Sequence, residues 1–260
     1  MHPMLNIAIR AVRIGGNFMI QKYDIQKHFD PSCNHNKNPF EQTIYISQQK
    51  IIKTILKYYP NHLVYTNDVI VNNSLNNTKW IINPLDGSLN FKKNIPHFCI
   101  SIAIQIKNQT VISVIYDPIK NELFTAIKGK GAQLNGYRMR CNNTSNIIHS
   151  SISINFSHYK LSNLQLYLQI IKILLMEKIN FRCTGSTTLD LAYVATGRLD
   201  CLLNIHFQPW VFCAGELQLK ESGAFIYNLT HNNDNKTFQF SLIGNAKLTR
   251  LIFDKIKNHL

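Results

Sequence analysis

The first sixty residues carry two amphipathic patterns separated by a polar stretch. Residues 4–21 are predicted to form a helix, because apolar side chains recur there at helical spacing: Leu5, Ala8, Ile9 and Val12. Residues 24–39 are polar and contain Pro31, which predicts a loop. The next apolar group predicts a second helix that ends near Tyr58-Tyr59-Pro60: Ile51, Ile52, Ile55 and Leu56.

Short apolar runs bounded by turn residues fill the middle of the chain, a pattern typical of strands. One short strand is expected at residues 62–65, before a polar, asparagine-rich stretch from Asn67 to Thr78. Three further runs are expected to pair as antiparallel neighbours: residues 98–106, 111–116 and 122–127. Turn residues separate these runs and mark a following hairpin: Asp117-Pro118, Gly129, Gly131 and Asn135-Gly136.

The second half of the chain mixes helical and strand patterns. Strands are expected at residues 151–155 and 202–205. A long helix between them is predicted to carry four apolar side chains on one face: Leu164, Leu168, Ile171 and Leu175. Three more helices are expected: residues 188–196 before Gly197, residues 212–222 before Gly223, and a C-terminal helix marked by Leu248, Leu251, Ile252 and Ile256. This mixture predicts an α/β (mixed α+β) fold with layers around shared sheets.

The stretch from Trp80 to Phe91 carries the candidate chemistry. Trp80 to Ile82 reads as a buried strand, and Pro84 is expected to end its hydrogen-bond ladder because proline has no N–H. Asp86-Gly87-Ser88 is turn chemistry, so a carboxylate, the Leu85 carbonyl and a hydroxyl would lie together at the end of the strand. Such oxygen ligands suit Mg²⁺.

Composition and charge add one further possibility. At 45% hydrophobic and 16% charged residues, the chain of 260 residues is predicted to be globular. The formal net charge of +14 favours polyanions such as RNA or DNA as partners. The positive residues are scattered, however, and Asn, Ile and Lys are abundant throughout, so drift in codon usage is the competing explanation.

The six cysteines and the N-terminus indicate a reduced, cytoplasmic protein. No cysteines form a C-x-x-C pair, so we expect them to be reduced and mostly structural: Cys33, Cys99, Cys141, Cys183, Cys201 and Cys213. Arg10 and Arg13 interrupt the apolar pattern of the first helix, which therefore does not read as a signal peptide. No stretch reaches the ~20 apolar residues that a membrane span needs.

Several motifs together resemble the inositol monophosphatase family. The Trp80-x-x-x-Pro84-Leu85-Asp86-Gly87-Ser88-x-Asn90-Phe91 stretch resembles that family's metal-binding signature. Further matches follow in unbroken order over essentially the whole chain: Pro96-His97-Phe98, Ser101-Ile102-Ala103, Tyr116-Asp117-Pro118, Asn121-Glu122-Leu123-Phe124, Gly129-x-Gly131-Ala132, Leu134-Asn135-Gly136, Thr184-Gly185-Ser186, Leu189-Asp190, Gly197-Arg198-Leu199-Asp200, Pro209-Trp210 and Ala214-Gly215-Glu216.

The resemblance implies a five-layer αβαβα sandwich, a homodimer and Mg²⁺ as cofactor. It also implies a single domain over residues 1–260 with two lobes, roughly 1–145 and 146–260. The opening Met1 to Asn6 looks most like bacterial members that also serve as Nus factors. These members act in antitermination of ribosomal RNA transcription and in ribosome biogenesis. Implied partners are therefore RNA polymerase and Nus factors, with contact to ribosomal RNA through their complex.

The departures from the family pattern concern the metal ligands. Of the four carboxylates that the resemblance implies, only Asp86 is present. The other three positions hold Asn67, Asn83 and Val211. A further aspartate, which in the family pairs with the signature threonine, falls at Ile44, and the threonine itself is Ser88. Asp68 beside Asn67 would replace the lost glutamate only with a shift in register.

The resemblance also implies a substrate-binding group: Asp86, Gly87, Ser88, Leu89, Arg182 and Ser186. Three of its members have a plainer alternative. Asp86 is either a weak metal ligand or a turn residue whose carboxylate caps nearby N–H groups. Ser88 is a weak catalytic candidate, and a turn or helix-start hydroxyl is the alternative. Arg182 would bind an anion or is a surface arginine.

Four further positions favour structural roles. We expect Glu216 to be a helix-surface charge and His97 to be a core or turn histidine. Trp210 and Phe212 are expected in the core.

Two functions from different classes follow from these observations. Phosphate monoester hydrolysis is very slow without catalysis, and Mg²⁺ needs anionic ligands to hold it. If each lost ligand costs a few kcal/mol, the rate falls by ~10³-fold or more. The favoured hypothesis is a Nus-factor-type interaction protein on a phosphatase scaffold. The alternative is a weak Mg²⁺-dependent phosphatase acting on inositol-1-phosphate.

Overall fold

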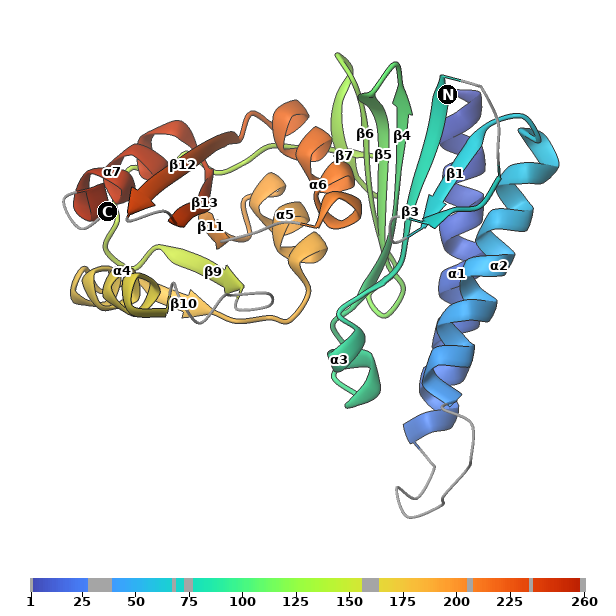
Figure 1. Ribbon diagram of the computed structural model, residues 1–260, viewed down its shortest axis with the longest axis horizontal. Helices are drawn as coiled ribbons and strands as arrows, with labels where there is room; N and C mark the ends of the chain where they lie inside the picture. The colour runs from blue at the N-terminus through green and yellow to red at the C-terminus, as the bar shows by residue number, and fades with distance from the viewer. Residues whose placement is uncertain are drawn as a thin grey trace.

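The computed structural model describes residues 2–27, 39–66, 69–72, 77–155, 164–204, 208–233 and 236–257. Within them the chain forms the predicted five layers, αβαβα, shown in Figure 1. Two mixed sheets alternate with three layers of helices, so the predicted mixed α/β class and sandwich architecture are confirmed. Positions 67 and 68, which the sequence analysis discussed as ligand candidates, lie outside the described residues.

Two long N-terminal helices, α1 (Pro3–Lys27) and α2 (Pro39–Tyr58), form one outer layer. Both predicted helices are confirmed, and each extends into the stretch 24–39 that was expected to be a loop. Their apolar stripes pack on one face of the large sheet, where Leu5, Ile51 and Trp80 are almost fully buried. This burial explains why helical spacing was a good guide here.

The large sheet has eight strands in the order β2-β1-β3-β4-β5-β6-β7-β8. The strands are β1 (Leu63–Thr66), β2 (Val69–Ile70), β3 (Thr78–Asp86), β4 (Cys99–Ile106), β5 (Gln109–Asp117), β6 (Glu122–Ile127), β7 (Gly131–Leu134) and β8 (Tyr137–Met139). The pairs from β3 to β8 are antiparallel, as predicted, whereas β1 and β3 are parallel. β8 is therefore the last strand at one edge of this sheet.

Pro84 does not end its strand, which corrects the sequence prediction. β3 continues to Asp86, and Pro84 lies inside it. The pairing of β3 with β4 shifts register between Asn83 and Asp86. A proline, which has no N–H to donate, is tolerated at such an irregularity.

The middle layer consists of α5 (Thr187–Ala195) and α6 (Pro209–Ser222), which lie between the two sheets in Figure 1. Both were predicted, and both end at a glycine with positive φ: Gly197 at 74° and Gly223 at 85°. Their buried side chains share one core with strands of both sheets, for example Leu189, Ala103 and Ile243. This layer therefore fixes one sheet relative to the other.

The second sheet has five strands in the order β10-β9-β11-β13-β12. The strands are β9 (Ser151–Asn155), β10 (Asn180–Arg182), β11 (Cys201–Asn204), β12 (Phe225–Asn233) and β13 (Lys236–Gly244). β9 and β11 were predicted, and the sequence analysis missed β10 and the β12–β13 hairpin. The second half of β12, with Thr230 to Asn233, is polar and carries no apolar alternation.

The other outer layer, α4 (Leu164–Met176) and α7 (Ala246–Ile256), covers the far face of the second sheet (Figure 1). The face of α4 that packs on the core holds Tyr167, Ile170 and Leu174, which are at most 2% exposed. Leu168 and Leu175, from the predicted apolar stripe, are 50% and 54% exposed. Because α4 is apolar on most of its circumference, the spacing alone did not identify its buried face.

The short helix α3 (Ser88–Lys92) follows the end of β3 and completes the described elements. None of the described helices is long and apolar enough to cross a membrane. The division into two lobes near residue 145 stays a prediction.

Leu174→Ala is expected to lower the free energy of unfolding by about 2–5 kcal/mol, because Leu174 is fully buried on the core face of α4 and its truncation leaves a cavity. Leu175→Ala is the matched control, since the neighbouring side chain is half exposed and should cost no more than about 0.5 kcal/mol. Urea unfolding followed by circular dichroism measures both values. Equal losses in the two variants would contradict the orientation of α4.

Candidate functional site

The candidate site begins where β3 ends and α3 starts. Gly87 lies between them with φ of 84°, a conformation that side chains with a Cβ rarely adopt. A Cβ added at this position would also lie 2.8 Å from the carbonyl oxygen of His97. Both constraints favour glycine, so the Asp86-Gly87-Ser88 motif is used for a tight turn from strand to helix.

The carboxylate of Asp86 is directed toward the N-terminus of α5. Its Oδ2 atom accepts hydrogen bonds from the Ser186 hydroxyl at 2.6 Å and from the Thr188 backbone N–H at 2.7 Å. Ser186 is the N-cap residue of α5, yet its own side chain caps no N–H of that helix. Asp86 therefore supplies the cap from another element, where the helix dipole also favours a negative charge.

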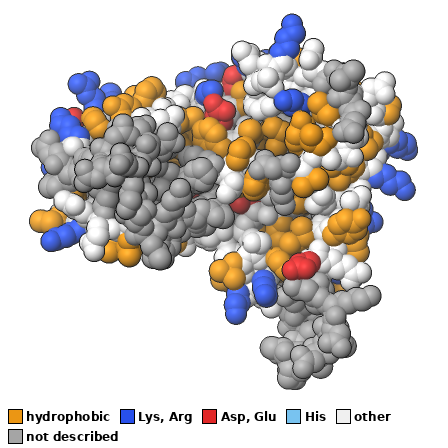
Figure 2. Space-filling model, in the orientation of Figure 1, with side chains coloured by type: hydrophobic (Ala, Val, Ile, Leu, Met, Phe, Trp, Pro, Cys, Tyr) orange, Lys and Arg blue, Asp and Glu red, His pale blue; other side chains and the backbone are white. Residues whose placement is uncertain are grey.

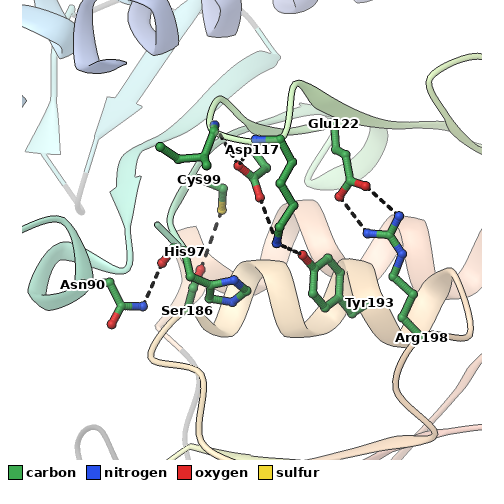
Figure 3. Close-up of polar contacts among 10 residues, drawn as sticks. Asn90, His97, Cys99, Asp117, Glu122, Ser186, Tyr193 and Arg198 are labelled. Carbon is green, nitrogen blue, oxygen red and sulfur yellow. Dashed lines mark hydrogen bonds and ion pairs between the residues drawn. The ribbon is translucent and has the colours of Figure 1, made fainter. Parts of the chain in front are cut away.

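Asn90 joins the two motifs on the other side of the turn. Its Nδ2 group donates to the carbonyl of His97 at 2.7 Å and to the carbonyl of Thr184 at 2.8 Å. The first of these bonds is drawn in Figure 3. Gly185, next to Thr184, has φ of 81° and comes so close that an added Cβ would lie 2.9 Å from the Asn90 side chain. The signature stretch and the Thr184-Gly185-Ser186 loop are thus fastened together through one amide.

Burial controls the ionisation of Asp86. Desolvation raises the pKa of its carboxyl above the ordinary value, and hydrogen bonds from Ser186, Thr188 and Asn83 act in the opposite direction. Asn83 is itself 3% exposed, so its amide stands beside Asp86 inside the protein. At this position the chain supplies a neutral hydrogen-bonding group where a second carboxylate would repel the first.

Asp190 is a second buried carboxylate. It belongs to the Leu189-Asp190 motif but is not among the predicted site residues. It is 1% exposed, and its two oxygens accept from the Ser153 and Thr184 hydroxyls at 2.7 and 2.8 Å. Burial raises the pKa of Asp190 to about 7, and the negative charge of Asp86 adds to this effect. Asp190 follows Ser186 by about one helical turn in the same motif, and this spacing was the signal in the sequence that could have identified it.

The described residues do not fit a magnesium site. Oδ2 of Asp86 accepts two hydrogen bonds and each oxygen of Asp190 accepts one, so these donors compete with a cation for part of the lone pairs of the two carboxylates. Among the residues that the structure describes, no three His, Cys, Asp or Glu side chains gather where they could hold a metal ion. The remaining predicted ligands, the Leu85 carbonyl and the Asn83 amide, carry no charge.

The other predicted site positions are distributed over several elements. Ser88 is the exposed first residue of α3, and the side chain of Leu89 is 66% exposed. Leu85 is packed in the core under α1 and α2, as is the partly buried Ile44. Val211 is partly buried in the first turn of α6. Asn67 lies outside the described residues.

Two of the predicted substrate-binding residues have different surroundings. Ser186 is 1% exposed, and its hydroxyl is engaged with Asp86 and lies 3.9 Å from the Cys99 sulfur (Figure 3). Arg182 is exposed on β10, and its guanidinium donates to the carbonyl of Phe181 at 3.3 Å. Ser186 thus has a structural role in the cap, and an anion-binding role of Arg182 stays a prediction.

The neighbouring residues agree largely with their structural interpretations. Glu216 forms an i,i+4 ion pair with Lys220 at 2.5 Å on the surface of α6. His97 packs edge-on against the Tyr193 ring, and burial lowers the pKa of its imidazole to about 4, with Lys120 acting in the same direction. Phe212 packs against the middle core. Trp210 is only partly buried and joins none of the described core clusters, which differs from the expectation.

The described cysteines are free, as expected: Cys99, Cys141, Cys183, Cys201 and Cys213. Cys99 and Cys201 are fully buried, and burial raises the pKa of the Cys201 thiol to about 12. These two side chains therefore behave as small apolar groups of the core.

Comparison with known proteins identifies the family. The sequence profile of the inositol monophosphatase family matches residues 1–259. The Nus factor SuhB of Buchnera aphidicola subsp. Schizaphis graminum (strain Sg) is 48% identical over 263 aligned positions, which cover 98% of this chain and 97% of that protein. The Nus factor SuhB of Escherichia coli (strain K12) is 37% identical, over 100% of this chain and 98% of that protein.

Solved structures show the same architecture. The native extragenic suppressor protein suhB from Bartonella henselae superposes with a TM-score of 0.85 at 27% identity, over 100% of both chains. Inositol monophosphatase-II from Staphylococcus aureus MSSA476 superposes with a TM-score of 0.81 at 25% identity, over 99% of this chain and 95% of that chain.

Asp86→Ala is expected to lower the free energy of unfolding by about 1–3 kcal/mol, because the N-terminus of α5 loses its cap and two buried donors lose their acceptor. Asp86→Asn retains one acceptor oxygen and should cost less. Thermal unfolding with and without Mg²⁺ measures both effects. Stabilisation of the wild type by Mg²⁺, abolished in the alanine variant, would contradict the structural role and support a metal ligand.

Asp190→Asn is expected to remove a pH dependence of stability. A carboxyl whose pKa is raised in the folded state contributes stability that is full below about pH 4 and lost as the pH rises through about 7. The loss in the wild type should be on the order of a few kcal/mol, since one pKa unit corresponds to about 1.4 kcal/mol. Urea unfolding between pH 4 and 8 should show that the stability of the wild type relative to the variant falls as the pH rises. The control Asp254→Asn should follow the wild type, because a nearby lysine lowers the pKa of this exposed carboxyl below that range.

Proposed function

The chain belongs to the inositol monophosphatase family, and on that premise we propose that it is a Nus-factor-type protein supporting antitermination of ribosomal RNA transcription and ribosome biogenesis. It would serve through its surface, and its phosphatase activity would be weak or absent. The observation that carries the second part is the position of Asp86, which is used to cap α5.

The chemistry of phosphate ester hydrolysis supports this proposal. Metal ions in such a reaction neutralise the phosphate and lower the pKa of the attacking water, and they require anionic ligands to stay bound. Here the family's ligand positions hold one aspartate, two asparagines and a valine: Asp86, Asn67, Asn83 and Val211. We infer that Mg²⁺ binding is weakened. We also infer that Ser88 is not an activated group, because it is exposed and the position of its expected carboxylate partner holds Ile44.

The relatives support the first part of the proposal. Proteins at 48% and 37% identity over nearly the whole chain bear the name Nus factor SuhB. The agreement spans every layer of the sandwich, so partner surfaces on any of them could be shared. We propose RNA polymerase and other Nus factors as partners, with ribosomal RNA contacted through their complex. A homodimer in the cytoplasm is part of the same proposal.

The proposal is tested by two measurements on the purified protein. The first is binding to purified RNA polymerase with Nus factors, followed by size-exclusion chromatography, where we expect co-elution. The second is phosphate release from inositol-1-phosphate in millimolar Mg²⁺, where we expect ~10³-fold less turnover than from a variant with restored ligands, if each ligand is worth a few kcal/mol. That variant combines Asn67→Glu, Asn83→Asp and Val211→Asp.

The restored variant is also the control for the scaffold. If it gains Mg²⁺-dependent turnover while still binding polymerase, the ligand positions account for the lost activity and the surface acts separately. Efficient turnover by the wild type, removed by Asp86→Asn, together with failure to bind polymerase, would overturn the proposal in favour of a phosphatase.

A further inference from the structure

A pocket of about 520 Å³ lies at the edge strand β8, away from the Asp86 turn. Its polar lining comes from the β7–β8 hairpin and from the segment that follows α5: Asn135, Tyr137, Arg138, Arg140, Thr196 and Arg198. Its volume falls within the range of about 300–1,000 Å³ that is common for ligand sites. Neither the signature motif nor the proposed function uses this pocket.

Two arginines of the pocket are available to a ligand. Arg138 on β8 and Arg140 just after it are exposed, and both line the pocket with the buried Met139 between them in the chain. Residues two apart on a strand are separated by about 6.6 Å. Within the described part of the chain, neither guanidinium forms an ion pair.

The acidic residue of the pocket is already neutralised. Glu122 accepts two hydrogen bonds from Arg198, at 2.6 and 2.7 Å, in the bidentate geometry drawn in Figure 3. The Arg198 guanidinium also lies 5.1 Å from the centre of the Tyr193 ring, which holds it in place. The charges of Glu122 and Arg198 cancel, so the positive charges of Arg138 and Arg140 dominate the pocket.

An aromatic side chain stands next to the two arginines. Tyr137 is 80% exposed at the turn of the hairpin, the highest exposure given for a large hydrophobic side chain in the described residues. Contact between water and an exposed apolar ring is unfavourable, so covering the ring with a partner stabilises it. A nucleic-acid base is a flat partner that stacks on such rings. Paired cations at a regular spacing with an adjacent ring are the elements of single-strand recognition.

We propose that the β8 pocket binds the backbone of single-stranded RNA, with Arg138 and Arg140 on successive phosphates and Tyr137 stacked on a base. The net charge of +14 supplies the surrounding positive field. On the face in Figure 2, Lys and Arg side chains recur around the outline and acidic ones are few, which fits a weak general attraction focused by a local site. This inference rests on the proposed function only in the choice of RNA as the polyanion that the pocket binds in the cell.

The salt dependence of binding tests this assignment. The probe is a short, mixed-sequence, single-stranded RNA carrying a fluorophore, titrated with the full chain and followed by fluorescence anisotropy. Each phosphate contact to a single strand contributes about 0.7 to the slope of log K against log salt. Arg138→Gln with Arg140→Gln should therefore reduce the slope by about 1.4. Between about 50 and 200 mM salt, the wild type should lose about sevenfold more affinity than this variant.

Lys53→Gln with Lys57→Gln is the matched control, because it removes the same charge from exposed positions on α2, which packs on the opposite part of the sheet. This variant should keep the wild-type slope. Tyr137→Leu should weaken binding by about fivefold or more without changing the slope. Circular dichroism and thermal unfolding of each variant separate loss of fold from loss of contact.

Three outcomes would overturn the inference. The RNA does not bind, the two double variants change the slope equally, or a poly-glutamate peptide displaces the RNA equally well from the wild type and from the Tyr137→Leu variant. Charged residues at a sheet edge also prevent strand pairing between molecules. Aggregation of the Arg138/Arg140 variant with unchanged RNA affinity would therefore assign the arginines to edge protection. Binding of polymerase is measured separately, so failure here leaves the proposed function standing.

Discussion

The contact between Asp86 and the N-terminus of α5 is the constraint on which the centre of this molecule depends. β3 ends at Asp86 and is followed by a turn that favours glycine at Gly87. The Asp86 carboxylate accepts hydrogen bonds from the Ser186 hydroxyl and the Thr188 N–H. Asn90 adds a second fastening to the same loop through the carbonyl of Thr184. Because α5 belongs to the layer shared by both sheets, these few polar bonds connect the two halves of the core.

This arrangement holds the centre of the fold together with groups of the chain itself. In the Trp80 to Phe91 stretch, Gly87 and Asn90 fix the backbone, and the Asp86 carboxylate caps α5. The contacts of Gly87 and Asn90 involve neither Asn83 nor Val211. Asn83 is neutral, so it adds no charge repulsion beside Asp86. The turn is therefore fixed by residues other than the two at which the sequence departs from the expected family pattern.

Local patterns were sufficient for most elements, and tertiary context decided the rest. Helical spacing identified α1, α2 and α7 because each has one apolar face. On α4 it selected Leu168 and Leu175, which are half exposed, since that helix is apolar nearly all round. Pro84 has no N–H to donate, as the sequence analysis assumed, but it lies at a register shift between β3 and β4 that tolerates a proline. No sequence pattern predicts such a shift. The motif around Asp86 was found from residue types, whereas its partner on α5 was a hundred residues distant and became visible only in the fold. Asp190 was missed because its importance comes from burial.

The turn at Gly87 and the hydrogen bonds of Asn90 determine how far the folded state depends on metal ions. Many small metalloproteins gain part of their folding free energy from the bound ion and are lost when the ion is withdrawn. Here the strand, the turn and the helix start are joined by amide and hydroxyl groups of the chain itself. These contacts should therefore keep the protein folded when magnesium is scarce.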